Sequence, residues 1–250
     1  MRKFGLIGYP LGHSFSKKYF TEKFQKEQIH SCIYDNFPLT DINLLKGLIS
    51  IEHDLVGLNV TIPYKSDVIR FLDSISPEAR EIGSVNVLKI KRIGEKTILS
   101  GFNSDITGIK DSLRPFISKD VRNALVLGTG GSSRSVRYVL GIMGLNVTLV
   151  SRKPDSGSIS YSDLDAAIIN NTRLIVNTTP LGMYPDIDSC PDIDYSMLNK
   201  SHILFDLVYN PEITTFLRKG AEQGCTVISG LKMLHSQAEK SWEIWNDQNI

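Results

Sequence analysis

The sequence predicts an α/β protein of two domains, each built on a mostly parallel sheet. Short apolar runs alternate with helical stretches along the 250-residue chain, which is the pattern of β-α-β units. In the second part the alternation is most regular, and a glycine-rich loop joins its first apolar run to a helix. The polar segment 115–123 separates the two parts. We therefore expect two domains with a cleft between them, a common location for a small-molecule site.

In the first part, the apolar runs have the length of strands and the longer stretches have helical spacing. Residues 16–28 predict an amphipathic helix because Tyr19, Phe20 and Phe24 share one face. The runs 84–90 and 97–100 predict a hairpin that turns at Gly94. Further strands are expected at 4–7, 32–37 and 55–62, and a further helix from 68 to 72 onward.

The second part repeats this pattern more cleanly. Its runs of branched apolar residues are typical of buried parallel strands. Strands are expected at 124–127, 146–150, 173–176, 202–207 and 226–228, and helices at 133–143, 212–223 and 233–245.

Composition and charge narrow the class of protein. The chain is 41% hydrophobic and 22% charged with a formal net charge of +1, so it lacks the basic excess that binds nucleic acid or an anionic membrane. No apolar stretch is long enough to span a bilayer, and Gly8 and Pro10 interrupt the N-terminus too early for a signal sequence. Three widely spaced cysteines follow no metal-ligand pattern and are expected to be reduced thiols. These features predict a cytoplasmic protein without a metal site.

The loop after residues 124–127 indicates dinucleotide binding. Gly128 permits a tight turn, and Gly130 allows the backbone to approach a pyrophosphate, which the free N–H groups at the start of the next helix then hold. Ser133 takes the third glycine position, where a small residue still allows close packing of helix on strand. A glycine-rich turn that binds nothing is the alternative. The order strand, loop, helix favours a nucleotide site.

The end of the next strand indicates which dinucleotide binds. NAD sites place an Asp or Glu about 20 residues after the loop, where it bonds the ribose 2′-hydroxyl. Here the strand 146–150 runs into Ser151, Arg152 and Lys153 without a carboxylate. Arg152 can pair with a 2′-phosphate, although a solvated Arg-Lys turn is the alternative. The sequence therefore predicts NADP rather than NAD.

Polar residues follow the apolar runs of the first part where a sheet usually binds its ligand. Ser14 and Ser16 lie in the first strand-to-helix loop, and only one of them can cap the helix. Asn59 and Thr61 alternate along a strand and so share a face, and Lys65 follows. A bound polyol could supply the partners that such groups need, whereas the alternative is a solvated strand end with Lys65 on the surface.

Two more polar segments interrupt apolar runs in this part. One contains Asn86, and the other ends in Asp105. Asn-Ser-Asp is also an ordinary turn or helix-cap sequence, so Asp105 alone favours a cap. The number of such segments in loops of one domain nevertheless indicates a polar ligand.

Taken together, these segments resemble the shikimate dehydrogenase family. The matching motifs occur in order over nearly the whole chain, and the most specific are Asn59–Lys65 and Gly230–Gln237. The others are the segments 13–16, 82–86, 101–105, 128–131, 177–183 and 206–211. The resemblance implies an N-terminal substrate domain and a C-terminal Rossmann-like NADP-binding domain. It places residues 1–105 and 231–250 in the substrate-binding catalytic domain and 106–230 in the dinucleotide-binding domain.

The resemblance also implies a role for each motif residue. Lys65 and Asp105 form the catalytic pair beside the reacting C3 oxygen. The substrate-binding residues implied are Ser14, Ser16, Thr61, Lys65, Asn86, Asp105, Tyr209 and Gln237. The NADP-binding residues implied are Gly128, Thr129, Gly130, Gly131, Ser132, Ser151, Arg152, Leu207, Gly230 and Met233.

The implied activity is the reversible reduction of 3-dehydroshikimate to shikimate with NADPH, in chorismate and aromatic amino acid biosynthesis. In the implied mechanism, Lys65 stabilises the charge that grows on the C3 oxygen and can deliver a proton to it, and Asp105 orients Lys65 and the substrate hydroxyl. The two residues titrate as one coupled pair, so the transferred proton is assigned to the pair and not to either residue. A related enzyme acting on quinate or an aminated analogue, with NADP or NAD, is one alternative, and a non-catalytic NADP-binding regulatory module is another. No nucleic-acid or membrane partner is expected, and the protein is expected to be a monomer or a homodimer.

Overall fold

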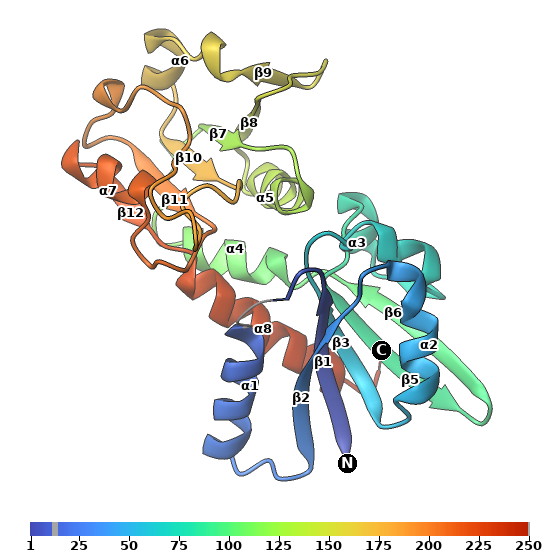
Figure 1. The fold of residues 1–250 in the computed structure, drawn as a ribbon. Coiled ribbons are helices and arrows are strands. Elements are labelled where there is room, and N and C mark those ends of the chain that lie inside the picture. Colours follow the sequence, from blue (N-terminus) through green and yellow to red (C-terminus); the bar gives the residue numbers. More distant parts are fainter. Residues whose placement is uncertain (12–14, 250) are drawn as a thin grey trace. The chain divides into compact units, whose positions relative to one another are not determined.

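The computed structural model describes residues 1–11 and 15–249, which form two compact units. Residues 1–104 together with 238–250 make the first unit, and residues 105–237 make the second (Figure 1). Helix α8 (Leu231–Asn246) contributes its first turns to the second unit and the rest to the first.

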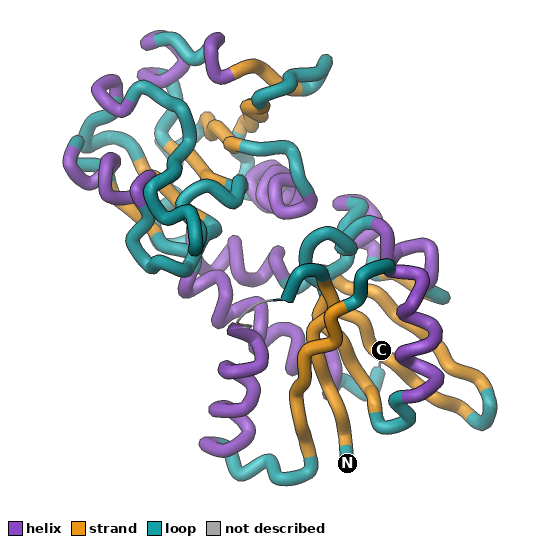
Figure 2. The backbone as a smooth tube through the Cα atoms, in the orientation of Figure 1, coloured by secondary structure: helices purple, strands orange, loops and turns teal. Residues whose placement is uncertain are grey.

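The first unit is built on a six-stranded sheet in the order β2-β1-β3-β5-β6-β4. Among its described strands, β5 alone runs antiparallel to its neighbours. Figure 2 shows helices flanking this sheet. Its elements are β1 (Arg2–Gly8), α1 (Phe15–Lys26), β2 (Cys32–Pro38), η1 (Ile42–Leu44), α2 (Leu45–Ile51), β3 (Leu55–Val60), η2 (Asp67–Phe71), β4 (Ser74–Ile75), α3 (Pro77–Ile82), β5 (Val87–Ile93) and β6 (Lys96–Phe102).

Two apolar clusters make the core of this unit, one of them between the sheet and helices α1 and α8. There Trp245 of α8 packs on Phe4 of β1, with 4.7 Å between ring centroids, and donates its indole N–H to the carbonyl of Leu88. Gly57 of β3 leaves room for this indole, because a Cβ at that position would lie 2.4 Å from it. The end of the chain is thereby part of the first unit's core.

The second unit holds a six-stranded, wholly parallel sheet in the order β12-β11-β10-β7-β8-β9. The strand order reverses at β7, which lies between β8 and β10, so the carboxyl ends of β7 and β10 mark the point where such sheets bind ligands. Its elements, besides the start of α8, are α4 (Asp105–Leu113), β7 (Asn123–Leu127), α5 (Gly131–Ile142), β8 (Asn146–Ser151), β9 (Ser158–Ser160), η3 (Tyr161–Asp163), α6 (Ala166–Asn170), β10 (Leu174–Asn177), η4 (Tyr195–Met197), β11 (Ile203–Asp206), α7 (Thr215–Glu222) and β12 (Thr226–Ile228).

The structure confirms the α/β class with mostly parallel sheets, and every expected strand forms within a few residues of its predicted bounds. The helix expected from 68 onward is wrong in type. It is the short 3-10 helix η2, which ends where Leu72 turns to an extended conformation. The helix expected from 212 begins only at Thr215, where the Thr214 side chain accepts from the Leu217 N–H. The polar segment 115–123 lies between α4 and β7, inside the second unit.

Candidate active site

In the first unit, the strand directions bring the predicted substrate residues to the same end of the sheet's strands. Strands β1 and β3 are parallel and end there, whereas the antiparallel β5 begins there, just after Asn86. The loops are joined by backbone hydrogen bonds. The N–H of Thr61 donates to the carbonyl of Ile7 at 2.9 Å, and the N–H of Val85 donates to the carbonyl of Lys65 at 2.7 Å. Thr61, Lys65 and Asn86 therefore lie on connected loops, as a shared site requires.

A buried hydrogen-bond network lies behind these loops. Asn86 Oδ1 accepts from the Ser104 N–H at 2.7 Å, and Asn86 Nδ2 donates to Ser104 Oγ at 3.1 Å. Ser104 Oγ also contacts Ser241 Oγ of α8 at 3.2 Å. Asn59 Nδ2 donates to the same Ser241 Oγ at 2.9 Å, and Tyr34 donates its hydroxyl to Asn59 Oδ1. A bound ligand was the expected hydrogen-bond partner of the Asn59 side chain, but this side chain bonds to other side chains of the protein.

The two serines of the first strand-to-helix loop differ in what the structure describes. Ser14 lies outside the described residues. Helix α1 begins at Phe15, so Ser16 is inside its first turn rather than at the N-cap. The half-buried Ser16 hydroxyl hydrogen-bonds the phenol of Tyr34, whose pKa burial raises. Ser16 is therefore tied to the network that holds Asn86.

The predicted catalytic residues occupy different settings. Lys65 is half-buried in the turn after β3, in the first unit. Asp105 is the first residue of α4, in the second unit, and only 1% of it is exposed. The free N–H groups of a helix start favour a carboxylate there. A buried carboxylate directly after Ser104 differs from the solvated cap that its local sequence also allowed.

The glycine loop of the second unit has the geometry of an anion site. Gly128 has φ of 109°, a region that favours glycine, and a Cβ there would lie 2.8 Å from Thr178 Oγ1. Gly130 is the N-cap of α5, makes no side-chain cap bond, and has no described atom within 4 Å of a Cβ built on it. The first N–H groups of α5 are thus left for a ligand, so this cradle fits a pyrophosphate. Thr129 of the loop is exposed, and Gly131 and Ser132 are partly exposed.

A second loop position, Gly230 near the predicted nicotinamide position, requires glycine because another backbone segment passes close to it. A Cβ on Gly230 would lie 2.4 Å from the carbonyl oxygen of Leu207, and the Gly230 N–H donates to the Val208 carbonyl. Met233 is 6% exposed and packs against Gly108 of α4, so most of its side chain belongs to the core. The structure thus joins the Leu207 and Gly230 loops but leaves little of Met233 for a cofactor.

The remaining predicted contacts of the second unit are partly exposed. Burial raises the pKa of the half-buried Tyr209 phenol, and Gln237 is half-buried on α8.

Ser151 ends β8, and its hydroxyl bonds both the N–H and the carbonyl of Lys153. Arg152 is exposed in this turn, close enough to Tyr161 for its charge to oppose the rise that burial causes in the Tyr161 pKa. Arg152 is therefore accessible to a ligand at the end of β8.

A buried carboxylate that sequence reasoning did not single out joins two strand ends here. Asp206 ends β11 with no exposed surface, and its Oδ1 accepts from Asn177 Nδ2 of β10 at 3.0 Å. Asp206 Oδ2 accepts from Thr214 Oγ1 at 2.6 Å. Burial raises the pKa of Asp206 to about 6, against these bonds, which lower it. The available signal was a polar residue ending each of two neighbouring buried strands.

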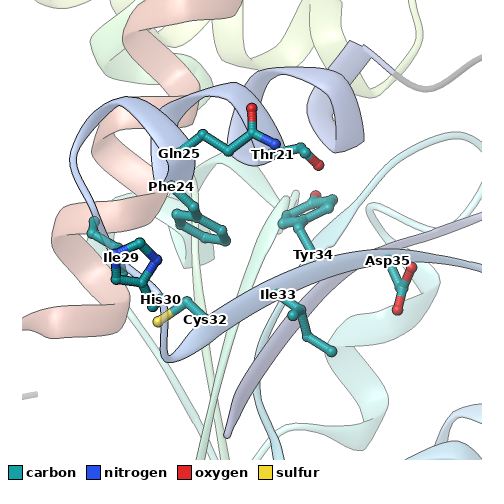
Figure 3. Close-up of a pocket in the computed structure, with 9 residues that line it drawn as sticks. All are labelled: Thr21, Phe24, Gln25, Ile29, His30, Cys32, Ile33, Tyr34 and Asp35. Atoms are coloured by element: carbon teal, nitrogen blue, oxygen red, sulfur yellow. The ribbon is translucent and has the colours of Figure 1, made fainter.

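A separate hollow of about 400 Å³ opens between α1 and β2 (Figure 3). Phe24 and Tyr34 line it together with the polar side chains of Thr21, Gln25 and His30. It reaches the amino end of β2. Because β2 is parallel to β1, this end of the strands is opposite the carboxyl ends where the predicted substrate loops lie. The hollow contains none of the predicted site residues.

Within residues 1–11 and 15–249, no three His, Cys, Asp or Glu side chains are grouped to hold a metal. No helix in this part of the chain is long and apolar enough to cross a membrane. The three cysteines form no disulfide.

Comparisons with known proteins bear on this arrangement. Residues 6–88 match the model of the shikimate dehydrogenase substrate binding domain. The shikimate dehydrogenase (NADP(+)) of Methanococcus aeolicus is 36% identical over 260 residues, which cover 96% of this chain and 90% of that protein. The chain belongs to the shikimate dehydrogenase family. The shikimate dehydrogenase (NADP(+)) of Clostridium beijerinckii is 37% identical over 99% of this chain and 93% of that protein.

Comparison with solved structures also finds shikimate dehydrogenases. The structure of shikimate 5-dehydrogenase from Thermus thermophilus in complex with NADP(H) and shikimate superposes with a TM-score of 0.84. It is 29% identical and covers 98% of this chain and 94% of its own. The family expected from the motifs is confirmed.

Proposed function

We propose that the protein is an NADP-dependent oxidoreductase that interconverts 3-dehydroshikimate and shikimate, in chorismate and aromatic amino acid biosynthesis. The observation that carries the proposal is similarity over nearly the whole chain to enzymes named shikimate dehydrogenase (NADP(+)). Lys65 and Asp105, the groups that the chemistry needs, are both present.

Cofactor binding rests on the uncapped start of α5. The N–H groups that follow Gly130 hold the pyrophosphate, and the loop from Gly128 to Ser132 lets its backbone approach. Ser151 and Arg152 hold the adenosine ribose and its 2′-phosphate at the end of β8. The proposed contacts beside the nicotinamide are Leu207, Gly230 and the exposed part of Met233.

Catalysis rests on proton transfer and charge stabilisation by this chain's residues. When bound, NADPH supplies the hydride that reduces the C3 ketone of 3-dehydroshikimate. The ammonium group of Lys65 stabilises the growing charge on the C3 oxygen and donates the proton, and Asp105 orients Lys65. In the oxidative direction the same pair accepts the proton as one coupled unit.

The other proposed substrate contacts hold the carboxylate and the ring hydroxyls. They are Ser14, Ser16, Thr61, Asn86, Tyr209 and Gln237. The support in the first unit is the network that fixes Asn86 and Ser16.

A spectrophotometric assay in the reduced-nicotinamide band tests the proposal. Initial rates are measured on the full-length protein with shikimate or quinate, each with NADP or NAD. Shikimate with NADP is expected to give the highest kcat/KM. A quinate preference would instead assign a quinate/shikimate enzyme, an NAD preference would overturn the cofactor, and no turnover with any pair would favour a regulatory NADP-binding module. A cytoplasmic location and a monomeric or homodimeric state stay predictions.

A further inference from the structure

A small hollow adjoins the glycine loop of the second unit. Its volume is about 260 Å³, and the glycine loop, the first turns of α5, strand β8 and the loop after β8 surround it. The residues that line it are Thr129, Ser133, Arg134, Arg137, Leu149, Asp155 and Gly157. In a sheet of this kind, the adenosine ribose lies between the glycine loop and the end of the second strand, here β8. The hollow is therefore next to the expected position of the ribose 2′ substituent.

The charge of this hollow suits an anion. Arg134 and Arg137 are one helical turn apart on α5, so both reach the same side of the helix, and both are exposed. One lining residue, Asp155, is acidic. Its carboxylate accepts from the Gly157 N–H at 3.0 Å and the Ser158 hydroxyl at 2.8 Å, and these bonds lower its pKa. Hydrogen bonds from its own loop therefore stabilise the negative charge of Asp155.

Arg137 makes no ion pair with any described residue, unlike two other arginines of the second unit. Arg173 pairs with Asp120 and Arg218 pairs with Glu222. A guanidinium that is not held in an ion pair can give paired, charge-assisted hydrogen bonds to a phosphate dianion. Arg152 alone, exposed on the turn after β8, approaches from the loop only.

We propose that Arg137 is a second cation of the 2′-phosphate site and so a determinant of NADP specificity. It holds the phosphate from the α5 side while Arg152 holds it from the loop side. The inference rests on the proposed use of NADP and names a helix residue that the glycine-loop and strand-end motifs do not contain.

Two probes that differ only in the 2′-phosphate test this assignment. Adenosine 2′,5′-bisphosphate and AMP are titrated calorimetrically into full-length wild type, Arg137→Ala, Arg152→Ala and Arg122→Ala. Arg122 is the matched control, because it is exposed and directly precedes the amino end of β7, whereas the glycine loop follows the carboxyl end of that strand. Arg137→Ala is expected to weaken binding of the bisphosphate about tenfold, or about 1.4 kcal/mol, and to leave AMP affinity unchanged. Arg122→Ala is expected to bind both probes as the wild type does.

Three outcomes would overturn the inference. They are an unchanged bisphosphate affinity in Arg137→Ala, an equal loss for AMP, and an equal loss in Arg122→Ala. If Arg152→Ala alone weakens the bisphosphate, the loop holds the phosphate and NADP specificity stands without Arg137. Shikimate turnover with NADP by the wild type tests the proposed function separately, so each can fail without the other.

Discussion

Asp206 allows a quantitative test of how burial acts on the second unit. Its carboxylate has no exposed surface, and burial raises its pKa from 3.8 to about 6 although Thr214, Val208 and Asn177 donate hydrogen bonds to it. The folded protein therefore binds a proton at this site more tightly than the unfolded chain does. Asp206→Asn removes the titration and keeps the shape. The amide oxygen accepts in place of Oδ1, and the amide nitrogen donates to Thr214 Oγ1.

The sign and size follow from the pKa shift. Because the folded pKa lies above the unfolded one, the contribution of Asp206 to stability is fully present below the unfolded pKa of 3.8 and is lost as pH rises through about 6. A shift of about two units at about 1.36 kcal/mol per unit corresponds to about 3 kcal/mol. The free energy of unfolding of wild type minus that of Asp206→Asn should fall by most of this amount between about pH 4 and about pH 7.

The assay is urea unfolding followed by far-ultraviolet circular dichroism over this pH range. Both tryptophans, Trp242 and Trp245, belong to the first unit, so their fluorescence would miss the second. Asp163→Asn is the control, because the Ser160 hydroxyl and N–H lower the pKa of this exposed carboxyl. Its contribution is present above the unfolded pKa and is lost as pH falls, which is the opposite direction. A wild-type minus Asp206→Asn difference that stays flat or rises with pH would refute the reasoning.

The other predictions concern catalysis and binding. Lys65→Ala is expected to bind shikimate but lose about 10²- to 10⁴-fold in kcat, since it removes the general acid; a kcat near that of wild type excludes Lys65 from the mechanism. Ser14→Ala and Gln237→Ala should weaken shikimate binding by about 1–3 kcal/mol, and NADP titrations that show the same loss would mean the site is misplaced. Arg152→Ala should lower kcat/KM for NADP by about one to two decades and leave NAD nearly unchanged, with Arg152→Asp lower still. An unchanged NADP-to-NAD ratio in Arg152→Ala would show that the phosphate is held elsewhere.

The fold class and most of the strands could be predicted from the sequence alone. Buried parallel strands read as continuous apolar runs, so 226–228 is predicted with its observed bounds and 124–127 within one residue. The backbone conformation at some loop positions could also be predicted from the sequence. Gly128 was expected to make a tight turn and has a positive φ, because glycine lacks a Cβ and adopts such a conformation without steric cost. The family motifs also name the candidate site residues, since each motif is local in sequence.

The short helices and the hydrogen-bond networks behind the site depend on tertiary packing and could not be predicted from the sequence. Helices such as α2 and α6 span too few turns for a periodic apolar face to show, and packing rather than propensity stabilises them. The bond between Asn59 and Ser241 joins residues 182 positions apart, and that between Asn177 and Asp206 joins residues 29 apart. The hollow that contains Arg137 likewise gathers α5, β8 and the loop after it. No spacing in the sequence records such contacts, because their partners meet only when strands and helices far apart in the chain pack together.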